Sequence, residues 1–213
     1  MERAEKPFNK VRSKNKRAEG LVSDKREAIL RAAIKIFAGF GYFNSKVSDI
    51  AAEAGVADGT VYLYFKNKDD ILHSIFDRAM AEFIAEGKRE IAGLDGPRER
   101  LARIAELHLE KLGADRDLAV VFQVELRGSI KFMQEFSAAG FAEYLEIIAR
   151  TIEEGQRTGD FSRGIKPVIA AKILYGCLDE MVTNWVLSQR SYPLSPMAAE
   201  VLKVFFGGVL SGK

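Results

Sequence analysis

Apolar residues recur along most of the chain at steps of three and four positions, and clusters of glycine, proline, serine and charged residues separate the periodic stretches. This spacing is typical of amphipathic helices, which present one apolar face to a core. No stretch alternates between apolar and polar residues for long enough to predict a strand. The pattern therefore predicts an all-α fold of about nine helices, over residues 23–40, 46–54, 58–64, 69–91, 97–113, 115–126, 141–156, 167–188 and 196–209.

Two short predicted helices within residues 46–70 have a spacing that suits DNA. Gly55 lies between them and can adopt a positive φ angle, which ends a helix without a steric penalty. Ile50 faces inward from the first helix, and Val61 and Phe65 face inward from the second. This arrangement is a helix-turn-helix, whose second helix enters the major groove. The same spacing also fits an ordinary pair of helices in a helical core.

The outward positions of this segment offer the side chains that DNA contacts require. Hydroxyl groups and lysines bind phosphates, glycine allows close approach of the backbone, and threonine can pack on a thymine methyl group. The predicted DNA-binding residues are Ser45, Lys46, Ser48, Asp58, Gly59, Thr60, Tyr62, Tyr64, Lys66 and Lys68. Seven basic and seven acidic residues lie between Asp24 and Asp70, so the attraction to DNA has to come from the placement of a few lysines and from the basic residues that precede Asp24.

A basic leader precedes the first predicted helix, which starts at Ser23 or Asp24. Residues 1–20 contain seven Lys or Arg and three Glu, a net charge of +4, whereas the whole chain carries +2. Few apolar residues can anchor this stretch, and we predict that residues 1–22 are disordered. Such an arm can lie along phosphates or in a minor groove, or it can be a solvated tail without a role.

Composition narrows the class of protein. The chain has 213 residues, 47% of them hydrophobic and 29% charged, which is enough for a small domain and a larger one with a cavity. No apolar run approaches the roughly 18 residues of a transmembrane helix, so we expect a cytoplasmic protein without a membrane partner. The single cysteine, Cys177, excludes an internal disulfide and is predicted to be buried, because it lies among apolar residues.

Catalytic and metal-binding motifs are missing from the sequence. The two histidines, His73 and His108, lack a ligand constellation, and Asp70 with His73 is a lone pair where a di-iron bundle needs two Glu-x-x-His repeats. No nucleophile-elbow, phosphate-loop or dinucleotide-binding pattern occurs. We therefore predict that the protein is not an enzyme and has no metal site and no cofactor.

The segments VSDIAAEAGVADGTVYLYFKNKDDIL (residues 47–72) and REAILRAAIKIFAGFGYFNSKV (residues 26–47) resemble the TetR family of one-component transcriptional repressors. The resemblance covers Asp24 to Leu72. It implies a three-helix DNA-binding domain, a larger helical domain that binds an effector, and a homodimer on a palindromic operator of double-stranded DNA. The predicted domains are then a helix-turn-helix domain over residues 23–68 and an effector-binding and dimerisation domain over residues 69–213.

The last two predicted helices carry apolar residues on more than one face. A helix that is apolar nearly all round has to be buried on both sides. The resemblance implies that these two helices pair with the same helices of a second subunit. We therefore predict a homodimer through the last two helices, which supplies two DNA-reading helices for a palindrome.

Large, soft side chains are frequent in the larger domain and predict a cavity for a hydrophobic small molecule. The predicted effector-binding residues are Phe76, Met80, Phe83, Phe122, Leu126, Arg127, Phe132, Met133, Phe136, Phe141, Tyr144, Ile148 and Trp185. Each apolar member of this set also fits an ordinary core. The segments LAVVFQVELRGS (residues 118–129) and LYGCLDEMVTNWVL (residues 174–187) resemble the FadR-type branch of the family, which regulates fatty acid degradation. That resemblance implies that the effector is long-chain acyl-CoA and that it releases the repressor from DNA.

A long apolar tunnel favours long acyl chains, because each buried CH₂ group contributes about 0.8 kcal/mol. The CoA end is anionic and requires cations at the tunnel mouth. Arg127 is the first candidate, and Arg103, Lys111 and Arg150 are weaker ones; Asp179 and Glu180 either order such cations or lie on the surface. Two alternatives stay open: a TetR-type repressor of an efflux or detoxification operon that senses aromatic or multidrug ligands, and a helical lipid-binding or interaction protein without DNA readout.

Overall fold

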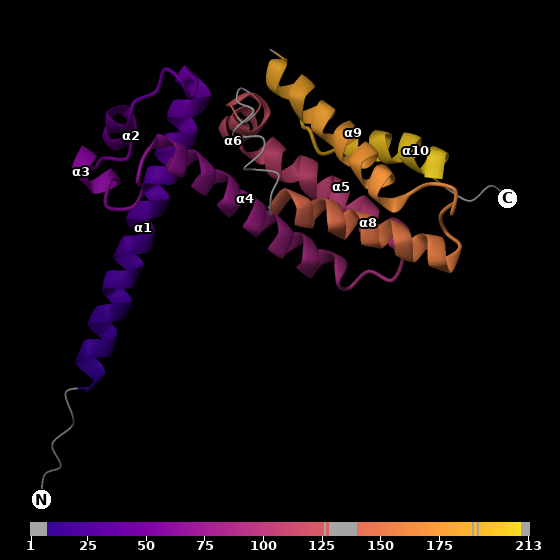
Figure 1. Cartoon of the computed structure of the whole chain (residues 1–213), viewed down its shortest axis with the longest axis horizontal. Coiled ribbons are helices and arrows are strands. Elements are labelled where there is room, and N and C mark those ends of the chain that lie inside the picture. The colour runs from indigo at the N-terminus through magenta and orange to yellow at the C-terminus, as the bar shows by residue number, and fades with distance from the viewer. Residues whose placement is uncertain (1–7, 126, 128–139, 189, 191, 210–213) are drawn as a thin grey trace, which may run out of the picture. The chain divides into compact units, whose positions relative to one another are not determined.

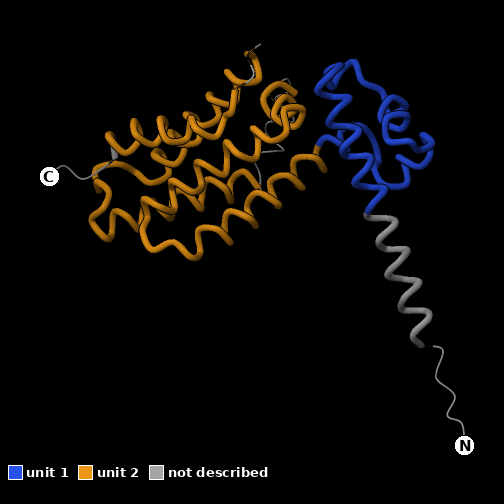
Figure 2. The backbone as a smooth tube through the Cα atoms, turned by 180° about the vertical axis from the view of Figure 1, so that it is seen from behind, with its two compact units in different colours: residues 1–72 blue, residues 73–213 orange. Residues whose placement is uncertain are grey.

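The computed structural model describes residues 8–125, 127, 140–188, 190 and 192–209, with side chains from residue 24 to residue 208 of these ranges. The described residues form nine α-helices and one π-helical segment and contain no strand, which confirms the predicted all-α fold (Figure 1). The chain divides into two compact units, residues 1–72 and residues 73–213 (Figure 2). None of the described helices has the length and apolar content needed to cross a membrane.

Unit 1 contains α1 (Phe8–Phe40), α2 (Val47–Glu53), α3 (Asp58–Val61) and the first turn of α4 (Lys68–Ile91). The predicted start of the first helix at Ser23 or Asp24 was wrong, because α1 already begins at Phe8. The added stretch contains five Lys and Arg residues, which favour helices, and no proline interrupts it. Of the leader that we predict to be disordered, residues 1–7 lie outside the described residues and residues 8–22 have a helical backbone.

Short connections in unit 1 set the angle between α2 and α3. The backbone N–H of Lys46 donates to Asp49 Oδ2 over 2.9 Å, which closes the first turn of α2. Gly55 ends α2 with a φ angle of +68°, in the left-handed region that favours glycine. Ile50 of α2 is completely buried and Phe65 after α3 almost completely, α2 packs against α1, and the Arg26 guanidinium of α1 lies 5.1 Å from the centre of the Phe65 ring. The predicted helix-turn-helix packing is therefore present.

Unit 2 is a helical bundle. It contains the rest of α4, α5 (Pro97–Ala114), α6 (Arg116–Val120), the π-helical segment η1 (Val121–Glu125), α8 (Gly140–Thr158), α9 (Pro167–Leu187) and α10 (Met197–Val209). Helix α8 packs against α5 and α9, and α10 packs against the same two helices (Figure 1). Pro97 and Pro167 start α5 and α9, where a missing N–H costs nothing and the fixed φ angle suits the helix.

The core of unit 2 consists of aliphatic residues from α5, α8 and α9. Leu101, Leu109, Ile148, Leu174 and Leu178 are fully buried there. Burial of each such side chain contributes about 1.5–3 kcal/mol, which fixes these three helices relative to one another. The inner face of α4 completes the wall of a cavity beside this core.

One face of α9 and part of α10 remain uncovered within the chain. The apolar side chains that are about half exposed or more are Val168, Ile169, Ile173 and Leu187 of α9 and Val204 of α10. Cys177 is also exposed, so its predicted burial was wrong. The reason is helical phase: Leu174 and Leu178 point into the core, and Cys177, one residue before Leu178, lies about 100° away around the helix.

Candidate functional site

Unit 1 presents most of the predicted DNA-binding residues to solvent. Six of the ten are exposed, namely Lys46, Ser48, Asp58, Gly59, Tyr62 and Lys66. Thr60, Tyr64 and Lys68 are partly buried. The predicted inward residues Val61 and Phe65 are only 1% and 2% exposed. The exposed face of α3 is therefore the face that we predicted from the sequence.

The side chains of Ser45 and Lys68 make hydrogen bonds within unit 1. Ser45 is buried, and its hydroxyl donates to the carbonyl oxygen of Gly41 over 2.6 Å. The ammonium group of Lys68 donates to the carbonyl oxygens of Tyr42 and Ser45, over 2.6 and 2.9 Å, and lies 4.3 Å from the centre of the Tyr42 ring. These bonds tie the start of α4 to the loop after α1. Their predicted contacts with phosphate stay a prediction.

A hydrogen bond between Tyr42 and Asp69 also links the loop after α1 to the start of α4. The Tyr42 hydroxyl donates to the Asp69 carboxylate, and burial together with this bond raises the pKa of Tyr42. Leu63, which is not among the predicted residues, is also exposed (81%) beside Tyr62.

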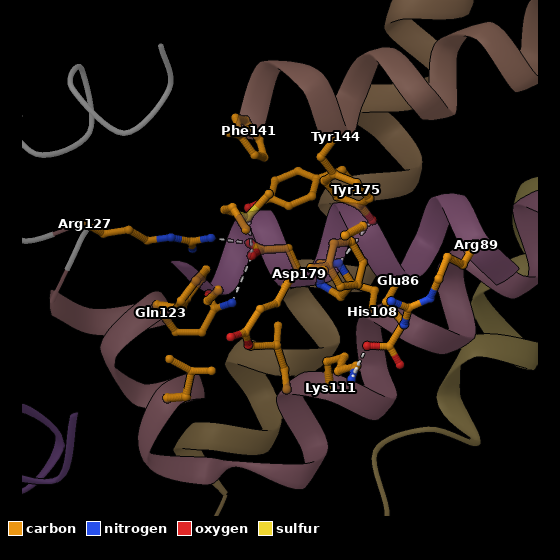
Figure 3. Close-up of a pocket in the computed structure, with 18 residues that line it drawn as sticks. Glu86, Arg89, His108, Lys111, Gln123, Arg127, Phe141, Tyr144, Tyr175 and Asp179 are labelled. Carbon is orange, nitrogen blue, oxygen red and sulfur yellow. Dashed lines mark hydrogen bonds and ion pairs between the residues drawn. The ribbon is translucent and has the colours of Figure 1, made fainter. Parts of the chain in front are cut away.

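Unit 2 contains a cavity of about 600 Å³ between α4, α5, α6, η1, α8 and α9 (Figure 3). This volume is within the range of small-molecule sites. Its lining is Ala79, Met80, Glu82, Phe83, Ala85, Glu86, Arg89, His108, Lys111, Leu112, Leu118, Phe122, Gln123, Arg127, Phe141, Tyr144, Tyr175 and Asp179. Aromatic and aliphatic side chains form most of the wall, and a few polar groups converge within it.

Asp179 is the centre of one polar group of this cavity. Its buried carboxylate accepts hydrogen bonds from Gln123 Nε2 over 2.9 Å and from the Tyr175 hydroxyl over 3.0 Å, and it pairs with the Arg127 guanidinium (Figure 3). The Thr183 hydroxyl donates to Gln123 Oε1 over 2.9 Å and holds the amide in place. Two neutral donors and one cation thus compensate the burial of this carboxylate.

A histidine and two tyrosines form the second polar group. His108 Nδ1 lies 3.1 Å from the Tyr144 hydroxyl, and the rings of Phe83 and Tyr175 lie edge to face against the imidazole, each with its centre 6.0 Å away. Burial lowers the pKa of His108 to about 4, and the nearby Asp179 carboxylate opposes this shift only in part. Burial also raises the pKa of Tyr144. Both groups are therefore neutral at pH 7.

Three basic residues line the cavity. Arg127 is bound to Asp179, and Lys111 pairs with Glu86 over 2.5 Å. Arg89 is exposed and makes no ion pair with other described residues. Two weaker candidates, Arg103 and Arg150, lie outside the cavity lining: Arg103 pairs with three glutamates, and Arg150 pairs with Glu146 on the surface of α8.

Six of the thirteen predicted effector-binding residues line the cavity: Met80, Phe83, Phe122, Arg127, Phe141 and Tyr144. Phe76, Ile148 and Trp185 do not. Phe76 is buried against the ring of Phe122 and Ile148 belongs to the core, while the Trp185 indole donates to the carbonyl oxygen of Tyr192. The other four, Leu126, Phe132, Met133 and Phe136, lie outside the described residues.

Sequence reasoning missed most of the polar lining. A signal was available for Tyr175, because it lies four residues before the candidate Asp179 on the same helix, where a buried carboxylate needs partners. Glu180, the other acidic candidate, is exposed. Within the described residues, no cluster of three or more His, Cys, Asp or Glu side chains is arranged to hold a metal ion.

Family models of known proteins match most of both units. A family model described as "Bacterial regulatory proteins, tetR family" matches residues 29–75, and a model described as "YsiA-like protein, C-terminal region" of the same family matches residues 76–208. The chain belongs to the TetR family. The boundary between the two family models falls within α4, a few residues from the boundary between the two units.

The relatives of this TetR-family chain are transcriptional regulators and not enzymes. The "Fatty acid metabolism regulator protein" of Bacillus subtilis is 38% identical over 85% of this chain and 93% of that protein. The structure of the fatty acid degradation regulator FadR from Bacillus halodurans superimposes with a TM-score of 0.83 and 35% identity, covering 86% of this chain and 95% of the other. FadR from Bacillus subtilis, solved in complex with stearoyl-CoA, gives a TM-score of 0.81 and 37% identity, covering 85% and 98%.

Proposed function

We propose that this TetR-family chain is a homodimeric repressor that binds a palindromic operator and leaves it when long-chain acyl-CoA occupies the cavity of unit 2. The observation that carries the proposal is the cavity itself. It has about 600 Å³ of largely apolar space in a chain that is 37% identical to a regulator solved with stearoyl-CoA.

DNA binding is supported by the exposed face of α2 and α3. Lys46 and Lys66 can contact phosphates, and Tyr62 can bond a phosphate through its hydroxyl. Gly59 lets the backbone approach the groove closely. Because residues 24–70 carry equal numbers of basic and acidic side chains, these few contacts and the basic leader would provide the electrostatic attraction.

A homodimer is supported by the uncovered apolar face of α9 and α10. Ile173 and Val204 are 52% and 78% exposed within a single chain, which is unfavourable for side chains of this type in water. Packing of this face against the same face of a second chain would cover it, since a twofold interface uses one patch twice. Two copies of unit 1 would then read the two halves of a palindrome.

An acyl-CoA effector is supported by the chemistry of the cavity. Phe83, Phe122 and Phe141 provide an apolar wall for an acyl chain, and each CH₂ group buried there adds about 0.8 kcal/mol to binding. We assign the anionic end of the ligand to Arg89, which lines the cavity and is exposed, because Lys111 is already paired with Glu86. Arg127 is less suitable than we predicted from the sequence, because Asp179 already neutralises it.

The proposal can be tested with DNA selected from a random library by repeated binding to the full chain. The selected sequences should be palindromic, and the fluorescence anisotropy of a labelled site should fall when stearoyl-CoA is added. Octanoyl-CoA should act only at much higher concentration, and CoA alone should have no effect. Release by hydrophobic dyes but not by stearoyl-CoA would favour a repressor of an efflux or detoxification operon. Binding without sequence preference would favour a lipid-binding or interaction protein.

A matched pair of variants tests whether Arg89 binds the anionic end of the ligand. Arg89→Ala should raise the stearoyl-CoA concentration needed for release from DNA roughly two- to tenfold, since one partly solvated charge contact is lost. Arg150→Ala removes an exposed arginine that does not line the cavity and should leave the effect unchanged. Equal behaviour of the two variants would remove Arg89 from the site.

A further inference from the structure

His108 has a buried nitrogen atom that its surroundings leave without a partner. The side chain is 7% exposed and lines the cavity, and its Nδ1 lies 3.1 Å from the Tyr144 hydroxyl. Nε2 is buried and forms no hydrogen bond with the described residues. A buried polar atom without a partner costs about 1–3 kcal/mol, so it has to be explained.

The hydrogen-bond pattern determines which nitrogen carries the proton. The imidazole is neutral at pH 7 because burial lowers the pKa of His108 to about 4, so only one of its nitrogens is protonated. The Tyr144 hydroxyl is buried, and among the described residues its one hydrogen bond is to His108 Nδ1. If Tyr144 donates to Nδ1, the imidazole proton is on Nε2 and one donor is left unpaired.

The opposite tautomer is less favourable. If Nδ1 donated to Tyr144, the hydroxyl proton of Tyr144 and the lone pair of Nε2 would both be buried without partners. The favoured state therefore presents an Nε2–H group that lacks an acceptor. A ligand in the cavity that brings an acceptor to this atom would remove the cost.

The surroundings of His108 indicate which acceptor fits. The rings of Phe83 and Tyr175 lie against the imidazole, and both residues line the cavity together with His108, so a ligand that enters the cavity contacts the side chains around the imidazole. A carboxylate in this apolar region would need a nearby cation, but Asp179 already neutralises Arg127. An uncharged carbonyl oxygen needs no such compensation.

We propose that His108 Nε2–H donates a hydrogen bond to the carbonyl oxygen of the acyl thioester, and that the protein thereby distinguishes thioesters from apolar chains without that oxygen. This proposal rests on the proposed acyl-CoA function and adds to it the residue that reads the acyl group. Tyr144 acts as a positioning residue, since it holds the tautomer in which Nε2 is the donor.

The test compares two ligands that differ in one oxygen atom. Palmitoyl-CoA carries the thioester carbonyl, whereas S-hexadecyl-CoA, the thioether, has the same number of chain carbons and the same CoA group without it. Titration calorimetry of the full chain should show that palmitoyl-CoA binds about tenfold tighter than the thioether. The variant His108→Leu/Tyr144→Phe, which removes both partners of the buried pair, should bind the two ligands equally.

Two further variants separate the hydrogen bond from packing. His108→Gln retains an N–H group close to the position of Nε2 and should keep most of the preference. Phe141→Leu changes the cavity wall without removing a donor and should weaken both ligands alike, with their ratio unchanged. Thermal unfolding of each ligand-free variant checks that it is folded.

The outcomes distinguish this proposal from the function on which it rests. If the natural chain binds both ligands with equal affinity, or if the His108→Leu/Tyr144→Phe variant keeps the tenfold ratio, His108 does not read the thioester. In both cases the acyl-CoA function stands. If neither ligand binds the natural chain, the proposed acyl-CoA function is wrong, and the proposal about His108 fails with it.

Discussion

Lys66 and Lys68 are two residues apart and have different surroundings, which a sequence pattern does not distinguish. Lys66 is exposed beside the proposed DNA-binding face, whereas the ammonium group of Lys68 donates to carbonyl oxygens of the loop after α1. Lys68 therefore acts within unit 1 as an internal cap. Its hydrogen bonds satisfy backbone groups that the turn leaves without helical partners.

We expect Lys68→Ala to lower the free energy of unfolding by about 1–3 kcal/mol, because charge-assisted hydrogen bonds are lost. Lys66→Ala should change stability by less than about 0.5 kcal/mol and should weaken operator binding at low salt, with the salt slope reduced by about one. Urea unfolding and anisotropy titrations at several salt concentrations measure both effects. If the two variants lose stability equally, the structural role of Lys68 is not supported.

The low pKa of His108 predicts a pH dependence of stability. In the unfolded chain the imidazole titrates near its ordinary value of 6.5, whereas in the folded chain burial lowers the pKa to about 4. Between these values the unfolded state binds more protons. The free energy of unfolding therefore falls as the pH decreases from 6.5 to 4, by about 3 kcal/mol at most from this residue.

Two variants isolate this contribution from that of the carboxylates. Tyr144→Phe keeps the buried histidine, whereas His108→Leu/Tyr144→Phe removes it. Urea unfolding at pH 7, 6 and 5 should show a steeper loss of stability for the variant that retains His108. Parallel pH curves for the two variants would show that His108 is not buried in the neutral form.

At the scale of helices, α9 has one buried face and one exposed face that is partly apolar. Leu174, Leu178 and Val182 are fully buried in the core, and the outward face carries Ile173, which is about half exposed. Ile173→Glu should therefore leave the fold of the chain intact, since the new carboxylate remains in water. It should disrupt the proposed dimer, because a buried unpaired charge at an interface is costly.

The measurement is molar mass by light scattering, together with operator affinity. We expect a monomer of unchanged helical content that binds the operator at least tenfold more weakly, because one unit 1 reads only half of the site. Ala92→Glu places the same charge on an exposed residue after α4 and should remain dimeric. A dimeric Ile173→Glu variant would place the interface elsewhere.

The helices could be predicted from the sequence because their signals are local. Pro97 and Pro167 mark two helix starts, and Gly55 marks the turn between α2 and α3. The phase of a helix is also local, which is why Val61 and Phe65 were assigned correctly. Which faces then converge depends on packing between distant segments, and no single-helix pattern contains that information.

The cavity illustrates this limit. Met80, Phe83 and Phe141 were predicted from their size alone, but Ile148 is equally apolar and belongs to the core. The polar lining depends on pairs such as Gln123 with Asp179, which are 56 residues apart in the chain. Their contact follows from the packing of η1 beside α9, and it cannot be derived from the spacing within either segment.

At the scale of the whole molecule, α4 connects the two proposed activities. Residues 68–72 belong to unit 1, and residues 73–91 belong to unit 2. Its first residue in the cavity lining is Ala79, about two turns after the end of unit 1. If ligand binding alters the operator affinity, the intervening turns have to transmit the change, and their stiffness should determine how much is transmitted.

Two exposed or partly exposed residues in these turns allow a test, namely Ser74 and Asp77. Ser74→Gly/Asp77→Gly should loosen the helix, since each glycine costs about 1 kcal/mol relative to alanine. The matched variant Ser74→Ala/Asp77→Ala makes the helix at least as stiff. Neither position lines the cavity, so both variants should bind stearoyl-CoA with the natural affinity.

In anisotropy titrations with and without stearoyl-CoA, the Ser74→Ala/Asp77→Ala variant should retain the full loss of operator affinity, and the Ser74→Gly/Asp77→Gly variant should show a smaller loss. Because typical coupling is about 1–3 kcal/mol, a decrease by half is measurable. An equal loss of operator affinity in the two variants would mean that the stiffness of α4 does not carry the coupling.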